Sequence, residues 1–99
     1  MRCKIVRYKV KPGQADENVR LIQDTFAELQ AKQVPGVRYV AYQLPDGSFI
    51  HMSFADGDTS PIPDLDAFKR FSSGLKDRTV DGPLQTDVAV VGNYRMLSE

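Results

Sequence analysis

Two side chains near the middle of the sequence have the chemistry for acid–base catalysis. Tyr42 could hold a phenolic substrate or take its proton, although a buried tyrosine more often packs with its hydroxyl bonded to a neighbour. His51 is the only histidine and could act as a base near neutral pH. Strand alternation puts His51 on the opposite sheet face from Tyr42, and the sequence pairs no carboxylate with it, which favours a structural role. These residues form no catalytic set that names a reaction.

The other reactive groups are weaker candidates. Asp56-Gly57-Asp58 loosely resembles a cation-binding loop, but the spacing and the terminal glutamate of an EF-hand are absent, so we interpret it as a solvated acidic loop. Cys3 is the only cysteine and has no visible activating neighbour. A lone cysteine excludes an internal disulfide and favours a reducing compartment, so we expect a cytoplasmic protein. Because the chain offers no ligand set for a metal or haem, we expect no bound cofactor.

Length and charge limit the classes of partner. The 99 residues predict one domain, 1–99, with a modest core. Thirteen basic residues balance thirteen acidic ones, so nothing in the charge attracts nucleic acid or an anionic membrane. No stretch approaches the roughly 20 apolar residues of a membrane span. We therefore expect neither nucleic acid nor membrane as a partner.

A hairpin carries both Tyr42 and His51. Val37 to Leu44 and Ser48 to Phe54 are rich in β-forming residues, and Pro45-Asp46-Gly47 between them suits a type I turn followed by a bulge. This turn pairs Tyr42 with Ile50 and Val40 with Met52. One face then collects Arg38, Val40, Tyr42, Leu44, Ile50, Met52 and Phe54, and the other collects Tyr39, Ala41, Gln43, Phe49, His51 and Ser53. Neither face has the clean polarity of a solvated surface.

The flanking segments predict two helices and two further strands. Cys3 to Val10 alternates as a strand, and Ala15 to Lys32 carries an apolar stripe at helical spacing. Ala55 to Asp64 is a loop rich in breakers, before a short or broken helix with Asp64 as a possible N-cap and Leu65, Phe68, Phe71 and Leu75 on one side. Asp81-Gly82-Pro83 indicates a turn. Val88 to Tyr94 indicates a last strand whose apolar run suits burial on both faces.

This order predicts an α+β, ferredoxin-like βαββαβ fold, in which a four-stranded antiparallel sheet carries two helices on one face. The second face is left uncovered although it is partly apolar. Exposed apolar patches of this kind usually mark an interface, so we expect a homodimer.

The whole chain resembles the dimeric α/β-barrel superfamily, in particular its antibiotic-biosynthesis monooxygenase-like group. Four short motifs carry the resemblance: Tyr8-Lys9-Val10-Lys11-Pro12-Gly13, Val34-Pro35-Gly36, Phe49 to Asp56, and Leu65-Asp66-Ala67-Phe68. The resemblance implies that two ferredoxin-like subunits pack sheet to sheet as an α/β barrel. It specifies fold better than chemistry, because the superfamily contains several kinds of enzyme.

The resemblance also implies a ligand pocket between sheet and helices. Tyr42 matches a tyrosine of the quinone-forming monooxygenases, which makes it the candidate catalytic residue. The candidate substrate-binding residues are Val6, Tyr8, Val40, Ile50, Met52, Phe54 and Phe68. Apolarity alone would turn the face with Val40 and Tyr42 toward the helices, whereas the resemblance makes it ligand-facing, and we follow the resemblance.

Two functions remain open at this point. One is a small-molecule-binding protein that acts as a cofactor-independent monooxygenase on an aromatic or polyketide-like substrate. The alternative is a non-catalytic ligand-binding or dimerisation module. It is favoured by Met52, which replaces an asparagine of the quinone-forming enzymes, and by the lack of any tryptophan.

Overall fold

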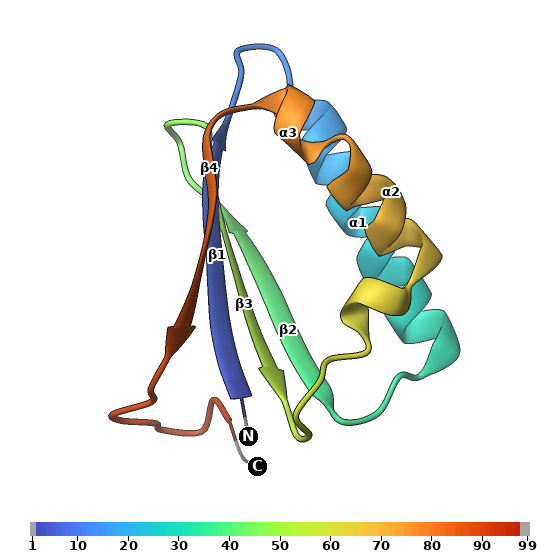
Figure 1. Ribbon diagram of the computed structural model, residues 1–99, viewed down its shortest axis with the longest axis vertical. Helices are drawn as coiled ribbons and strands as arrows, with labels where there is room; N and C mark the ends of the chain where they lie inside the picture. The colour runs from blue at the N-terminus through green and yellow to red at the C-terminus, as the bar shows by residue number, and fades with distance from the viewer. Residues whose placement is uncertain (1, 98–99) are drawn as a thin grey trace.

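The computed structural model describes residues 2–97 as one antiparallel sheet with helices on one face (Figure 1). The elements are β1 (Arg2–Val10), α1 (Ala15–Lys32), β2 (Val37–Gln43), β3 (Ser48–Ala55), the 3-10 turn η1 (Ile62–Asp64), α2 (Asp66–Ser73), α3 (Leu75–Arg78) and β4 (Thr79–Val88). The strand order is β2-β3-β1-β4. This arrangement confirms the predicted ferredoxin-like fold.

The β2–β3 hairpin has the predicted register. Tyr42 pairs with Ile50 and Val40 with Met52. The backbone N–H of Leu44 donates to the carbonyl of Ser48 at 2.8 Å, and the carboxylate of Asp46 accepts the N–H of Ser48 at 2.9 Å. The turn chemistry read from Pro45-Asp46-Gly47 therefore sets which side chains share a face.

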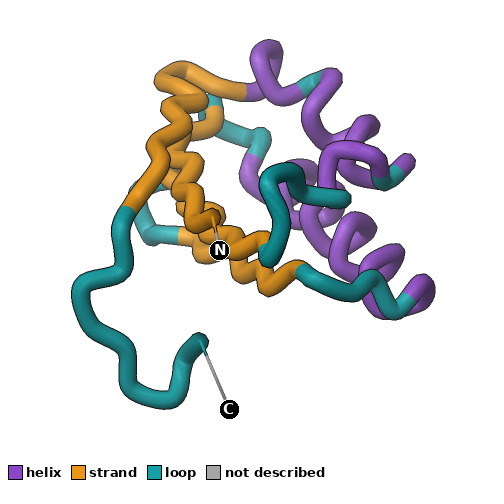
Figure 2. The backbone as a smooth tube through the Cα atoms, turned by 60° about the horizontal axis from the view of Figure 1, so that its bottom comes forward, coloured by secondary structure: helices purple, strands orange, loops and turns teal. Residues whose placement is uncertain are grey.

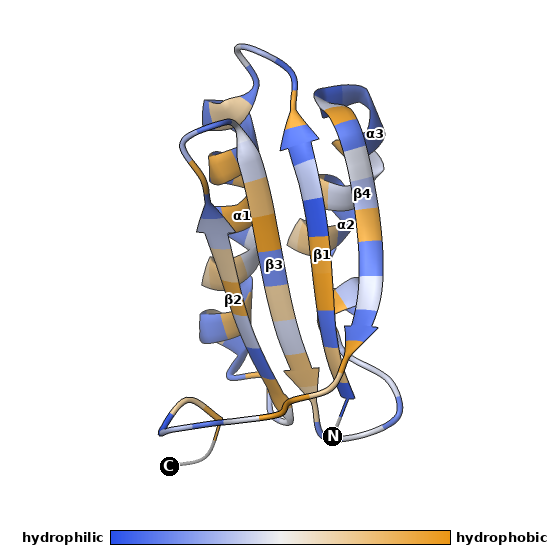
Figure 3. Cartoon of the chain, turned by 90° about the vertical axis from the view of Figure 1, so that its left-hand side faces the viewer, coloured by the Kyte–Doolittle hydropathy of each residue, from blue (hydrophilic) through white to orange (hydrophobic). Residues whose placement is uncertain are grey.

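The hydrophobic core lies between the sheet and the helices. It is built from Tyr8, Val10, Leu21, Ile22, Phe49, Phe71 and Leu75. Since Ala41 and Phe49 pack on this core, alternation turns Val40 and Tyr42 to the other face, which Figure 3 shows toward the viewer. The interpretation from apolarity alone is therefore wrong. The helix-facing side of the hairpin also carries polar groups, of which His51 is buried and bonded to the hydroxyls of Tyr8 and Tyr39.

The two main helices meet at Glu28. Helix α1 has the predicted bounds, but its most buried side chains include the polar Asn18 and Thr25. The predicted N-cap Asp64 is wrong, because Leu65 holds the cap position and its side chain makes no cap bond. The carboxylate of Glu28 instead accepts the N–H groups of Asp66 at 3.3 Å and Ala67 at 2.8 Å. An anion from α1 thus satisfies the first turn of α2.

The predicted break in the second helical segment is confirmed at Gly74, which separates α2 from α3. A Cβ at Gly74 would lie 2.8 Å from Nη1 of Arg78. Glycine at this position therefore leaves room for the buried guanidinium.

The last strand differs from its prediction. Strand β4 ends at Val88, where the predicted strand begins, and it includes the predicted turn Asp81-Gly82-Pro83. Because β4 is an edge strand with register shifts against β1, it tolerates a proline that cannot donate to a ladder. The apolar run beyond it is not buried: Val91 is 99% exposed. After Val88 the chain leaves the sheet and loops on the side away from the helices (Figure 2).

Gly82 fixes the close pairing of β4 with β1. Its φ is +90°, and a Cβ there would lie 2.8 Å from the carbonyl oxygen of Arg7. Gly13 has a similar φ of +84° but nothing within 4 Å of its Cβ position.

We expect Gly13→Ala to lower the free energy of unfolding by about 1 kcal/mol. Gly82→Ala should cost a further ~2 kcal/mol from the backbone clash. Urea unfolding measures both, and equal losses would contradict this role of Gly82.

Candidate functional site

A chain of buried and half-buried polar side chains runs between the sheet and the helices. The hydroxyl of Tyr39 lies 2.6 Å from Nδ1 of His51, and Nε2 of His51 lies 2.8 Å from the hydroxyl of Tyr8. Nδ2 of Asn18 donates to the Tyr8 hydroxyl at 2.9 Å, and Nε of Arg78 donates to Oδ1 of Asn18 at 3.1 Å. We call these five residues the polar relay.

The fold brings the relay together from distant parts of the sequence. Tyr8, His51 and Tyr39 come from the neighbouring strands β1, β3 and β2, and all three face the helices. Asn18 lies in the first half of α1, and Arg78 ends α3. Among residues 2–97, every fully buried side-chain nitrogen and oxygen has a hydrogen-bond partner. The relay is therefore a satisfied network rather than a set of strained polar groups.

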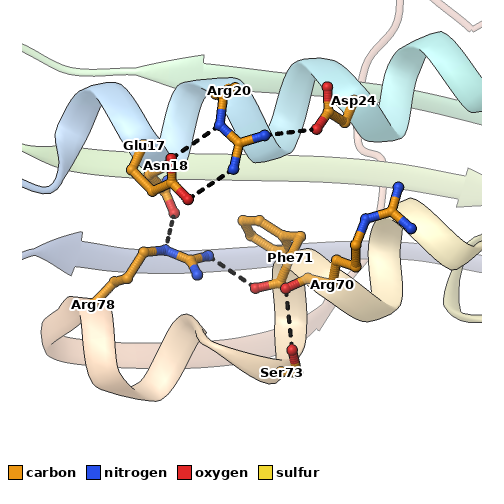
Figure 4. A network of polar contacts seen from close by, with 8 residues as sticks. All are labelled: Glu17, Asn18, Arg20, Asp24, Arg70, Phe71, Ser73 and Arg78. Atoms are coloured by element: carbon orange, nitrogen blue, oxygen red, sulfur yellow. Dashed lines mark hydrogen bonds and ion pairs between the residues drawn. The ribbon is translucent and has the colours of Figure 1, made fainter.

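Arg78 is held in place from three sides (Figure 4). Besides its bond to Asn18, its Nη2 donates to the carbonyl of Phe71 at 2.8 Å, and the guanidinium lies 5.3 Å from the Phe71 ring centre. Arg78 is only 7% exposed, and no carboxylate in the described part of the chain forms an ion pair with it. Burial lowers the pKa of Arg78, but a guanidinium keeps its proton in proteins. The relay thus ends on a fixed cation that only donates.

Burial keeps the three ring groups of the relay neutral. It lowers the pKa of His51 from 6.5 to about 4 and raises the pKa of Tyr8 to about 12, the latter opposed by the bond from Asn18 and the charge of Arg78. Burial, with a smaller contribution from Tyr8, also raises the pKa of Tyr39 well above 10. At neutral pH the relay therefore contains a neutral imidazole between two protonated phenols.

Aromatic rings enclose the imidazole. Ring centres of Tyr8 and Phe71 lie 5.3 and 5.4 Å from that of His51. Tyr39 stacks on Phe26 of α1 at 4.7 Å. These contacts hold the two phenols at the distances that the hydrogen bonds require.

Tyr39 connects the relay to open space. It borders a cavity of about 410 Å³, the inner cavity, where β1 begins and β3 ends. The wall is apolar at Ile62, Pro63 and Phe68, and polar at Ser53 and Thr59; Arg2, Lys4 and Asp58 supply its charges. Tyr39 also borders a groove of about 570 Å³ between α1 and β2, whose polar side chains are mostly amides. We place the candidate site in the inner cavity because it combines an apolar wall, cations and the end of the relay.

The predicted site residues do not line one pocket. Val6, Tyr8 and Phe68 lie on the helix side of the sheet, and only Phe68 borders the inner cavity. The remaining candidates, Val40, Tyr42, Ile50, Met52 and Phe54, lie on the opposite face. Tyr42 is 46% exposed there. The β1 candidates and the hairpin candidates thus lie on opposite faces of the sheet, and their role in binding stays a prediction.

Four relay residues were not predicted as site residues. Alternation already places Tyr39 and His51 together on one face, so two polar aromatic side chains on a shared face were a readable signal. Asn18 lies at helical spacing with Leu21, Ile22 and Thr25, which marks it as buried. Nothing in the sequence indicates that Arg78 reaches Asn18 across 60 positions.

Residues 2–97 contain no group of three or more His, Cys, Asp or Glu side chains that could hold a metal ion. Among their helices, none has both the length and the apolar composition to span a membrane.

No family model matches the sequence, and comparison with curated proteins found no match. Solved structures match most of the chain. A crystal structure of an antibiotic biosynthesis monooxygenase is 14% identical, with a TM-score of 0.75, and the match covers 93% of this chain and 100% of that one. The chain has the ferredoxin-like fold of antibiotic biosynthesis monooxygenases. The same enzyme name is attached provisionally to other matching structures.

Two further structures show how widely this fold is shared. A Pseudomonas aeruginosa protein is 18% identical, with a TM-score of 0.73, over 92% of this chain and 94% of its own. A Nitrosomonas europaea protein of unknown function is 12% identical, with a TM-score of 0.74, over 94% of this chain and 91% of its own. Such identities establish a common fold, so the chemistry must be argued from the residues of this chain.

The neutral His51 makes stability depend on pH. Because its pKa is lower folded than unfolded, its contribution is complete above pH 6.5 and is lost as the pH falls toward about 4. We expect this group to lower the free energy of unfolding by about 3 kcal/mol over that range.

Urea unfolding at several pH values measures the effect, with His51→Gln as the non-titrating control. Carboxylates with lowered pKa, such as those of Glu17 and Glu28, contribute equally to both proteins. The wild type should therefore lose more stability than the variant. Parallel pH profiles would show that His51 titrates normally in the folded state.

Proposed function

We propose that this protein is a cytoplasmic homodimer that binds a small aromatic or polyketide-like molecule in the inner cavity and oxidises it as a cofactor-independent monooxygenase. The observation that carries this proposal is the position of Tyr39, which borders the inner cavity and is bonded to the buried relay behind it. The cytoplasmic location rests on the lone cysteine, Cys3.

The inner cavity suits a small, flat ligand. Its volume of about 410 Å³ lies within the range of small-molecule sites, about 300–1,000 Å³. Phe68, Ile62 and Pro63 offer contact to an apolar ring system. The hydroxyl of Tyr39 and the cations near the cavity offer partners for a ring oxygen.

In the proposed reaction, the substrate itself supplies the electrons that reduce molecular oxygen. An anthrone-like molecule gives up the proton of its activated carbon to solvent before it enters the cavity, and the bound carbanion forms a C–O bond with molecular oxygen. The resulting peroxide anion takes up a proton from solvent and becomes a hydroperoxide. Loss of water from the hydroperoxide leaves a quinone carbonyl, so one oxygen atom enters the product and the other leaves as water. The protein holds the ionised substrate and keeps bulk water from its reactive carbon.

A second candidate function is ligand binding without catalysis. It is favoured by the pKa of His51, which at about 4 leaves the imidazole a weak base at neutral pH. A protein with this site would bind a phenol and leave it unchanged.

The homodimer is supported by the sheet face opposite the helices, which we call the open face. Tyr42 is 46% and Leu84 64% exposed on it, and Val40, Ile50 and Met52 are half-buried beside them. In the dimeric α/β barrels that this chain resembles, two subunits pack sheet to sheet, which supports a second subunit against this face. In this proposal Tyr42 packs in the subunit contact.

Met52→Arg tests the dimer. An arginine at this position would have to be buried without a partner in the interface, so we expect it to dissociate the dimer. Sedimentation should give the wild type twice the 11.1 kDa of one chain and the variant the mass of one chain. Ser72→Arg, which adds the same charge to an exposed site on α2, is the matched control and should leave the dimer intact. A monomeric wild type at micromolar concentration would contradict the dimer.

Oxygen uptake with an anthrone-like substrate tests the reaction. We expect faster uptake with protein than without it, and a loss of turnover by about 10²-fold in Tyr39→Phe, because the variant lacks the hydroxyl at the cavity. Tyr42→Phe decides between the two tyrosines, since turnover lost there but kept in Tyr39→Phe would put the reaction on the open face. Quenching of tyrosine fluorescence by a hydrophobic phenol without oxygen uptake would favour the non-catalytic function, and no binding of either compound would contradict both.

A further inference from the structure

The direction of every hydrogen bond in the relay follows from Arg78. A guanidinium can donate and cannot accept, so the Asn18 atom that faces Arg78 must be the amide oxygen. The amide nitrogen of Asn18 is thereby left to donate to the hydroxyl oxygen of Tyr8. One fixed cation thus orients an amide that would otherwise have two possible orientations.

The Tyr8 hydroxyl then fixes the tautomer of His51. Tyr8 is 2% exposed, and in residues 2–97 the acceptor within reach of its hydroxyl proton is Nε2 of His51. A proton on Nε2 would leave the Tyr8 proton buried without an acceptor, which costs about 1–3 kcal/mol. Nε2 therefore accepts, and the imidazole proton sits on Nδ1.

The imidazole in turn makes Tyr39 a donor. Nδ1–H of His51 donates to the Tyr39 oxygen at 2.6 Å, so the Tyr39 proton must point elsewhere. No acceptor for it is present among the described residues, and the ring is half-buried at the edge of the inner cavity. The raised pKa of Tyr39 keeps this proton in place at neutral pH.

The charges around the inner cavity favour an anion next to this donor. Arg2 and Lys4 approach from β1, and Asp58 approaches from the loop after β3. Arg2 is engaged by the Asp58 carbonyl at 2.6 Å and by the Asp87 carboxylate at 3.9 Å. Lys4 is half-buried, and within residues 2–97 it has no ion-pair partner.

We propose that the relay presents Tyr39 as a fixed hydrogen-bond donor, so that the inner cavity selects an aromatic ligand as its phenolate over the neutral phenol. This inference rests on the proposed ligand site and adds the ionisation state that the site accepts. Tyr39 contacts the ligand oxygen, and Arg78, Asn18, Tyr8 and His51 are positioning residues. Lys4 supplies the neighbouring positive charge.

The experiment uses para-nitrophenol, whose neutral and ionised forms differ in colour, and para-nitroanisole, a methyl ether of similar size that cannot ionise. An absorbance titration of the bound nitrophenol should show its pKa lowered by about one unit, a tenfold preference for the anion. In Tyr39→Phe the bound pKa should return to that of the free probe, while nitroanisole affinity stays the same. Lys4→Met should move the pKa of the bound nitrophenol part of the way back to that of the free probe.

Asn18→Asp tests the relay by reversing it. The carboxylate can accept from both Arg78 and Tyr8, so Tyr8 would then accept from Nε2–H of His51, and Nδ1 would accept the Tyr39 proton. We expect the variant to fold, to lose the phenolate preference and to move the imidazole proton to Nε2, visible in nitrogen NMR of labelled His51. A mere charge effect of the new carboxylate would leave the tautomer unchanged.

The outcomes are distinguishable. An unchanged nitrophenol pKa on binding, with nitroanisole bound equally well, would overturn the selection of phenolate and leave the ligand site intact. If the imidazole proton stays on Nδ1 in Asn18→Asp, the relay is not the cause of the phenolate preference. If neither probe binds, the ligand site itself fails, and this inference fails with it.

Discussion

The structure depends on an imidazole held between two phenols. His51 makes its hydrogen bonds to the hydroxyls of Tyr8 and Tyr39 at 2.8 and 2.6 Å, away from solvent. Losing either partner would leave a buried polar atom unsatisfied, at a cost of about 1–3 kcal/mol. The three rings come from three adjacent strands, so both bonds form in one register only. A slip by one residue in β2 or β3 would turn its ring to the open face.

The same interaction explains why the helices cover this sheet face rather than the more apolar one. The Tyr8 hydroxyl, the imidazole and Asn18 all have hydrogen-bond partners, so their burial costs little beyond their desolvation. Phe49 and Phe71 then pack around the group. The open face keeps Val40, Tyr42 and Met52, which leaves one side of the sheet for a ligand cavity and the other for a protein contact.

Much of the fold could be predicted because its signals are local. The turn at Asp46 sets the hairpin register, and the apolar spacing from Ala15 to Lys32 gives the bounds of α1. The choice of sheet face could not be predicted, because it depends on polar partners that meet only in three dimensions. Arg78 and Asn18 lie 60 positions apart in the sequence and come into contact only in the folded chain. The apolar run after Val88 predicted a strand, but β1 pairs with the polar segment before it.

The similar solved structures establish the fold, whereas the chemistry of the site is argued from the residues of this chain. Structures 12–18% identical share the arrangement of sheet and helices, including one of an antibiotic biosynthesis monooxygenase. The tautomer of His51 tests the account most directly, because every step from Arg78 to Tyr39 determines it. Nitrogen NMR of the labelled, unliganded protein at neutral pH should show Nδ1 protonated and Nε2 unprotonated. A proton on Nε2, or rapid exchange between both nitrogens, would contradict the account.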